Sequence, residues 1–145
     1  MSEDTMTPGF SRWSVTGYRR LKALDIALRP FNVLSGANGV GKSSLLDVFD
    51  LLAASAGGTL QSTVTDLGGM ASLLTADGKS NEIAFALQMD QDGAAPIEYK
   101  LRLASETVGY AIAHESLNQF RKPATLVPYK YIDAEGSRVR YHHGG

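Results

Sequence analysis

The most informative stretch of this sequence is Gly36-Ala37-Asn38-Gly39-Val40-Gly41-Lys42-Ser43. Its spacing, a glycine, four residues, Gly-Lys and then Ser, is the pattern of a phosphate-binding loop. The three glycines permit backbone angles that side chains forbid, so consecutive amide N–H groups can turn inward and form a nest for phosphate oxygens. The stretch therefore predicts a nucleotide site.

The polar side chains of this loop suit a nucleoside triphosphate with Mg²⁺. Lys42 is a flexible point charge that can reach the β- and γ-phosphates, and the Ser43 hydroxyl is a hard oxygen ligand of the kind Mg²⁺ takes. Ser44 can hydrogen-bond the α-phosphate. The predicted metal ligand is Ser43, and the predicted nucleotide-binding residues are Gly36, Ala37, Asn38, Gly39, Val40, Gly41, Lys42, Ser43 and Ser44.

The residues on either side of the loop predict a strand and a helix. Residues 31–35 form a compact apolar run, which favours a buried strand. From Lys42, apolar residues recur at helical spacing until Gly57-Gly58 ends the pattern. Strand, glycine loop and helix are the context that a phosphate loop requires. A dinucleotide fingerprint is excluded, since the third glycine of G-x-G-x-x-G is missing.

The rest of the chain predicts one lobe of α/β class over residues 12–145, with a mixed sheet. Residues 1–11 are expected to be a flexible leader, and Trp13–Tyr18 and Leu24–Leu28 read as strands that precede the loop. Residues 59–80 are irregular or contain a short helix around Met70–Thr75. Residues 81–145 are rich in β-patterns; alternation predicts an antiparallel meander of three strands, followed by two more. These five strands are predicted at Ile83–Met89, Ile97–Leu103, Val108–Ile112, Leu126–Ile132 and Arg138–Tyr141. Gln91-Asp92-Gly93 is predicted to be the turn between the first two of them.

The composition excludes several classes of function. The 145 residues include 14 Lys and Arg, 15 Asp and Glu, and no cysteine, which gives a net charge of −1. Disulfide scaffolds, thiolate zinc sites and thiol nucleophiles are thereby excluded. The near-zero charge gives no support for a protein held by nucleic-acid phosphates or an anionic membrane. No stretch approaches 18 apolar residues, so we expect a soluble cytoplasmic protein without membrane contact.

Several segments resemble the N-terminal part of ABC-type ATPases of the RecF, SMC and OLD-like group, which are often labelled AAA-family ATPases. They are residues 17–28, Phe31–Leu34, the loop and Leu45–Phe49. The resemblance implies the first lobe of a P-loop NTPase that binds ATP with Mg²⁺. It also implies that an aromatic-Arg pair after the first strand lies near the nucleotide, which carries over to Tyr18 and Arg19. Only this analogy suggests DNA as a partner, and the near-zero net charge does not support it.

Other motifs of that group are missing from the sequence. Hydrolysis there uses a carboxylate at the end of a second apolar strand and an acidic residue that positions water. The nearest case, Asp133 after Tyr131-Ile132, follows a charged residue and opens a predicted turn, so the catalytic residues stay unassigned. The Ser-Gly-Gly signature is also absent. We therefore expect an incomplete fold whose partner is a second ATPase lobe or protomer, and little hydrolysis by this chain alone.

Two other classes of function remain open. A P-loop small-molecule kinase shares the loop spacing, although such kinases generally begin with the loop strand, whereas here two strands precede it. A non-catalytic interaction protein that binds nucleotide as a structural ligand also fits the missing second motif. His114-Glu115 and His142-His143 read as surface residues, because no third catalytic partner or metal-ligand spacing accompanies them.

Overall fold

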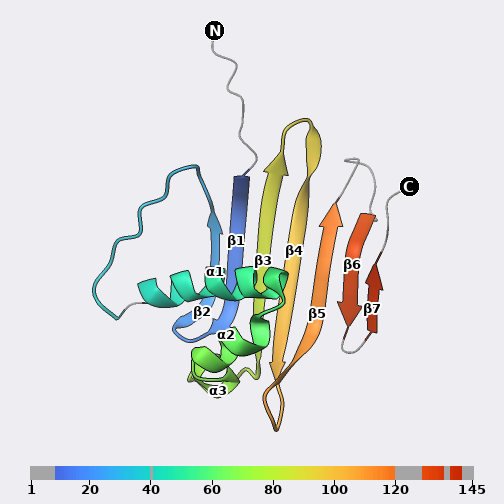
Figure 1. Ribbon diagram of the computed structural model, residues 1–145. Coiled ribbons are helices and arrows are strands. Elements are labelled where there is room, and N and C mark those ends of the chain that lie inside the picture. The colour runs from blue at the N-terminus through green and yellow to red at the C-terminus, as the bar shows by residue number, and fades with distance from the viewer. Residues whose placement is uncertain (1–8, 40, 120–128, 136–137, 142–145) are drawn as a thin grey trace.

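The computed structural model describes residues 9–39, 41–119, 129–135 and 138–141 (Figure 1). These residues form an α/β structure, as the sequence predicts. Its helices are α1 (Lys42–Gly57), α2 (Leu60–Asp66) and α3 (Met70–Leu73). Its strands are β1 (Gly9–Tyr18), β2 (Leu21–Ala27), β3 (Glu82–Gln91), β4 (Ala94–Ser105), β5 (Tyr110–Gln119), β6 (Tyr129–Glu135) and β7 (Arg138–Tyr141).

All seven strands belong to one sheet, in the order β2-β1-β3-β4-β5-β6-β7, and every neighbouring pair is antiparallel. The predicted meander is confirmed as β3, β4 and β5. Its register places Phe85 opposite Val15 on one side and Leu101 on the other. The prediction of a mixed sheet is wrong for the described residues, because every strand pair among them is antiparallel and the strand predicted before the loop lies outside the sheet.

That segment, residues 31–35, was predicted to be a buried strand, and this prediction is wrong. It carries no strand pairing and follows an exposed path between β2 and α1 (Figure 1). Phe31 is 82% exposed and Val33 is 77% exposed. An apolar run becomes a buried strand only where a neighbouring strand pairs with it and a second layer covers it. Among the described residues, no strand pairs with residues 31–35 and no second layer covers them.

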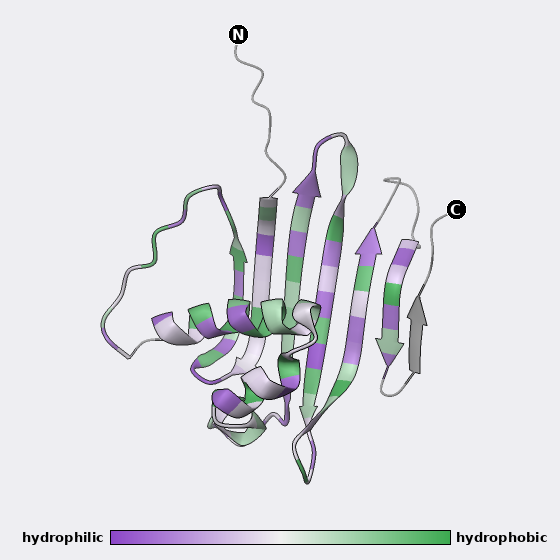
Figure 2. Ribbon diagram, viewed as in Figure 1, coloured by the Kyte–Doolittle hydropathy of each residue, from purple (hydrophilic) through white to green (hydrophobic). Residues whose placement is uncertain are grey.

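The helices cover one face of the sheet and build the core against it (Figure 1). Helix α1 packs on β1 through the rings of Phe49 and Trp13, whose centroids lie 4.9 Å apart. It reaches β4 through Ser55 Oγ and Tyr99 Oη, which are 3.0 Å apart. Strand β4 shows the alternation of polar and apolar residues that such one-sided packing requires (Figure 2). Within the described residues, no helix combines the length and apolar character needed to cross a membrane.

Several element boundaries differ from the sequence predictions. β1 begins at Gly9, so part of the predicted leader is strand. Helix α2 was not specified, and the predicted short helix at Met70–Thr75 is observed as α3. β5 runs to Gln119, well beyond the predicted end at Ile112. Of the next predicted strand, Leu126–Ile132, only residues 129–132 are described, and they form the first part of β6.

Burial of Tyr18 predicts a loss of stability at alkaline pH. The side chain is fully buried beside Phe85, with ring centroids 6.2 Å apart, and burial raises its pKa from 10.0 to about 12. Between these values the unfolded chain loses the phenolic proton while the folded chain keeps it. The stabilisation is therefore complete below pH 10 and disappears as the pH approaches 12.

We expect Tyr18→Phe to reduce this alkaline loss, because phenylalanine keeps the buried ring and cannot ionise. The measurement is the urea midpoint of both proteins at pH 8, 10 and 11. Burial also raises the pKa of Tyr99 and Tyr110, so only the difference between the two proteins reports Tyr18. A constant difference across the three pH values would contradict the assignment.

Candidate functional site

The predicted phosphate loop is a bent, exposed segment that leads directly into α1. Gly39 and Gly41 have φ angles of 81° and 114°, in the left-handed region that favours glycine. Gly36 has no such angle, so its part in the predicted pattern is not explained by positive φ. Residues 36–39 are exposed, and Val40 lies outside the described residues. Two of the three predicted glycines therefore have the backbone angles that the sequence pattern requires.

Lys42 spans the loop from the first turn of the helix. Its Nζ donates to the carbonyl oxygens of Gly36 and, at 3.1 Å, Ala37. These contacts bring the start of the loop back toward its end, so the segment is curved rather than extended. An ammonium group has three donors, and the two loop carbonyls use two of them. One donor is left for a phosphate oxygen.

The N-terminus of α1 supplies unpaired amide groups next to the loop. No side chain caps this end and no acidic residue lies in the first turn, although the Leu45 amide donates to the Gly41 carbonyl at 3.0 Å. Free amides and the positive end of the helix dipole favour an anion here. Ser43 is exposed and Ser44 is 8% exposed, so the chain presents the Ser43 hydroxyl more openly. The Ser44 contact with a phosphate stays a prediction.

Arg19 lies in the turn between β1 and β2 and is bound to other parts of the framework. Its Nη1 donates to Asp47 Oδ2 of α1 at 2.6 Å, and its Nη2 donates to the Leu67 carbonyl at 3.1 Å. The guanidinium also lies 5.6 Å from the centroid of the Tyr18 ring. The structure thus places Arg19 on the side of α1 that faces α2, and the predicted nucleotide contact of Arg19 and Tyr18 stays a prediction.

Arg20, which sequence reasoning did not select, is the arginine of this turn that reaches the loop. Its Nη1 donates to the carbonyl oxygen of Gly39 at 2.5 Å. In the sequence, the one feature that points to Arg20 is its position directly after the aromatic-Arg pair Tyr18-Arg19. The sequence also did not indicate Asp47 as the partner of Arg19, because the two residues are 28 positions apart and no motif links them.

The remaining acidic and histidine candidates lie far from the loop. Asp133 is in β6, separated from β1 by three strands, and accepts a hydrogen bond from Lys130 Nζ at 2.8 Å. His114 and Glu115 alternate on β5, so they face opposite sides of the sheet. In the parts of the chain that are described, no cluster of three His, Asp or Glu side chains forms a metal site. His142 and His143 lie outside those parts.

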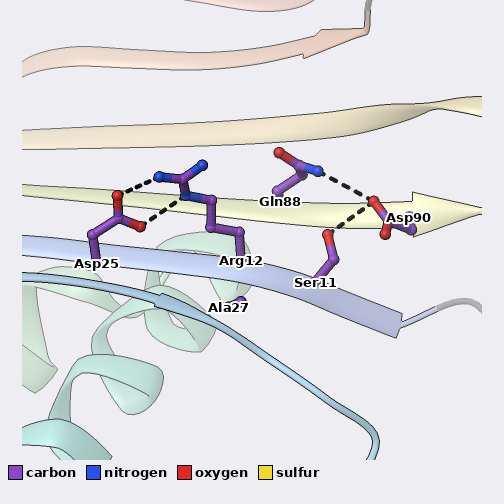
Figure 3. Close-up of a pocket in the computed structure, with 6 residues that line it drawn as sticks. All are labelled: Ser11, Arg12, Asp25, Ala27, Gln88 and Asp90. Carbon is purple, nitrogen blue, oxygen red and sulfur yellow. Dashed lines mark hydrogen bonds and ion pairs between the residues drawn. The ribbon is translucent and has the colours of Figure 1, made fainter.

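A separate polar hollow of about 430 Å³ lies on the sheet, across β1, β2 and β3 (Figure 3). Arg12 forms a two-point ion pair with Asp25, at 2.8 and 2.5 Å, and the bond lowers the pKa of Asp25. Asp90 accepts hydrogen bonds from Ser11 at 2.8 Å and Gln88 at 3.2 Å. Two carboxylates against one arginine repel a triphosphate, so this hollow does not compete with the loop as a nucleotide site.

Comparison with known proteins identifies the family of the chain. A family model described as "AAA domain, putative AbiEii toxin, Type IV TA system" matches residues 31–141, about three quarters of the chain. The match includes the loop, the three helices and the β-meander, and β1 and β2 precede it. No curated protein matches the sequence significantly. The chain therefore belongs to this AAA-domain family and is an ATPase-like nucleotide-binding module.

Proposed function

We propose that this chain is the ATP-binding module of an ABC-type ATPase of the RecF, SMC and OLD-like group. The observation that carries the proposal is the curved loop at residues 36–41, which Lys42 spans and which opens onto the uncapped start of α1. Backbone amides, a lysine and a helix N-terminus are the three groups that hold a triphosphate in a phosphate loop. The family match supports nucleotide binding in general.

Mg²⁺ would bind beside this loop through the Ser43 hydroxyl. The donor set fits the ion, because Mg²⁺ prefers oxygen ligands and is usually bound by one or two protein groups, the substrate phosphates and several waters. Ser43 is exposed in the first turn of α1, next to the loop that would hold the phosphates. A bound ion would neutralise phosphate charge. Lys42 and the loop amides orient the triphosphate.

Hydrolysis requires groups that a second lobe or protomer would supply. Asp47, four residues after Ser43 on α1, is paired with Arg19 at 2.6 Å, so its carboxylate is already occupied by that ion pair. The apolar segment that precedes the loop is also exposed, with Phe31 and Val33 more than three-quarters accessible. Paired with a strand of another lobe, this segment would become the buried strand that its sequence predicts.

We expect Ser43→Ala to remove the effect of Mg²⁺ on ATP binding. The experiment is a calorimetric titration of ATP with and without Mg²⁺. The wild-type chain binds MgATP more tightly than free ATP, and the variant binds both equally, because alanine offers the ion no oxygen ligand. Ser62→Ala, an exposed serine of α2 whose hydroxyl bonds the Thr59 carbonyl, is the control and keeps the Mg²⁺ effect. An unchanged Mg²⁺ effect in Ser43→Ala would contradict the ligand assignment.

Phosphate release by the same samples separates the proposal from the other classes of function. We expect negligible turnover by the chain alone despite MgATP binding. Rapid hydrolysis would contradict the claim that essential groups lie on a second lobe. Transfer of phosphate from ATP to a small acceptor would instead identify a kinase.

A further inference from the structure

The two arginines of the β1–β2 turn are directed to different parts of the molecule. Arg19 has a left-handed φ of 45°, and its amide donates to the Leu73 carbonyl at 2.7 Å. With its bonds to Asp47 and Leu67, it links the turn to α1 and to the α2–α3 region. Its charge is balanced by the Asp47 carboxylate at 2.6 Å. Arg19 therefore has the contacts of a framework residue.

Arg20 instead lies against the phosphate loop. Its side chain is exposed, and its one hydrogen bond among the described residues goes from Nη1 to the Gly39 carbonyl. The turn also approaches the end of the loop, because a Cβ atom added to Gly41 would lie 3.8 Å from the Arg20 Cβ and 3.4 Å from Leu21 Cδ2. The turn and the loop therefore lie close together, and the guanidinium reaches the middle of the loop.

Arg19 is paired with the carboxylate of Asp47, whereas Arg20 has no such partner among the described residues. No ion pair of Arg20 occurs within the described ranges. A guanidinium carries five N–H donors in a planar fork, of which the Gly39 carbonyl takes one. The bond to the Gly39 carbonyl joins a cation to a neutral oxygen, whereas a bond to a phosphate oxygen also gains the Coulomb attraction between two opposite charges. A phosphate oxygen held in the loop would therefore compete well with a neutral carbonyl for this group.

We propose that Arg20 is a second cation of the phosphate site, which binds the phosphates of the nucleotide together with Lys42, and that Arg19 holds the turn in place. This inference rests on the proposed function of the loop. It assigns the two adjacent arginines separate roles, and it predicts that the exchange of the Gly39 carbonyl for a phosphate oxygen accompanies nucleotide binding.

The test compares Arg20→Gln with Lys22→Gln in the full chain. Glutamine at position 20 removes the charge and keeps an N–H donor on a shorter side chain, whereas Lys22 is an exposed cation of β2 whose Nζ lies 3.9 Å from Asp77. We expect Arg20→Gln to weaken MgATP binding roughly tenfold, the difference between a charged and a neutral hydrogen bond. AMP binding changes much less, since its single phosphate lies nearer the nucleoside. Lys22→Gln leaves both affinities within about twofold, as expected of an exposed surface charge.

The salt dependence and Arg19→Gln complete the test. Loss of a phosphate-binding cation makes MgATP affinity less sensitive to NaCl in Arg20→Gln, an effect that a purely structural residue would not produce. Arg19→Gln should lower the urea midpoint, because the variant loses the bonds to Asp47 and Leu67. An Arg20→Gln variant that binds MgATP as wild type, while Lys42→Ala binds it at least tenfold more weakly, overturns the role of Arg20 and leaves the proposed function intact. If the wild-type chain binds no nucleotide, both fail.

Discussion

Replacing Lys42 with alanine is expected to reduce ATP affinity about 10- to 100-fold, because a charge-assisted hydrogen bond contributes about 1.5–3 kcal/mol and each 1.4 kcal/mol is a factor of ten. The loss has two sources. The variant lacks the ammonium donor for the phosphates, and it also lacks the bonds from Nζ to the Gly36 and Ala37 carbonyls that curve the loop. Isothermal titration with MgATP measures the effect.

Lys100→Ala is the matched control for this experiment. It removes the same charge from a lysine of β4 whose Nζ is 2.8 Å from Glu98. Lys100 lies on the face of the sheet opposite to buried Leu101, away from α1. We expect its MgATP affinity to stay within about twofold of wild type, since exposed ion pairs contribute little. Equal losses in both variants would show that net charge, and not the loop, determines binding.

The second large effect is expected at Gly17, near the end of β1. Its φ is +75°, and an added Cβ atom would lie 2.3 Å from the carbonyl oxygen of Glu82 in β3. Gly17→Ala thus combines an unfavourable backbone angle with a collision against a backbone atom that cannot move without displacing β3. Together these effects are expected to cost about 3–5 kcal/mol. This is a large part of the typical 5–15 kcal/mol stability of a domain.

Gly93→Ala separates the two causes. Gly93 has a similar φ of +67° in the β3–β4 hairpin, but no atom lies within 4 Å of its added Cβ. It therefore pays only the backbone penalty, about 1–2 kcal/mol. Urea unfolding of the two variants gives the comparison. If both variants lose the same free energy of unfolding, the collision of the added Cβ with the Glu82 carbonyl is not what destabilises Gly17→Ala.

The sequence was sufficient to predict the elements whose patterns are local. Alternation located β3 and β4 because each has one face on the core, with Ile83 and Leu103 fully buried. The helix after the loop was predicted from spacing and from Gly57-Gly58, and Gly58 has the left-handed angle, φ 73°, expected at a helix end. The Gln91-Asp92-Gly93 turn is confirmed, since β3 ends at Gln91 and β4 begins at Ala94.

Other elements depend on contacts that no local pattern contains. The second half of β5 was missed because polar residues occupy both of its faces; His114 and Ser116 alternate with Glu115, which accepts a hydrogen bond from Tyr99 at 2.8 Å. Helix α2 contains β-branched residues that disfavour helix, and it is held by burial of Leu60 and Val64, four residues apart. In both cases tertiary packing overrides local preference.

The candidate site was predicted only in part, for similar reasons. The loop glycines and Lys42 follow from a motif whose chemistry is local. The roles of Arg19 and Arg20 do not follow from a local motif. They depend on the turn, in which Arg19 has a left-handed φ, and on the partners that the fold supplies, Asp47 for Arg19 and the Gly39 carbonyl for Arg20. The exposure of residues 31–35 likewise depends on which strands are available to pair with them, which an apolar run cannot specify.

The most direct measurement is the change in backbone amide chemical shifts of the ¹⁵N-labelled chain on titration with MgATP. We predict saturable shifts centred on Gly36, Gly39, Gly41 and Lys42, because in the proposed site their amides lie around the bound phosphates. In the Lys42→Ala chain these shifts should require much higher ATP concentrations. Saturable shifts at Asp25 and Asp90, which line the polar hollow on the sheet, would contradict nucleotide binding at the loop if the loop amides stayed unchanged.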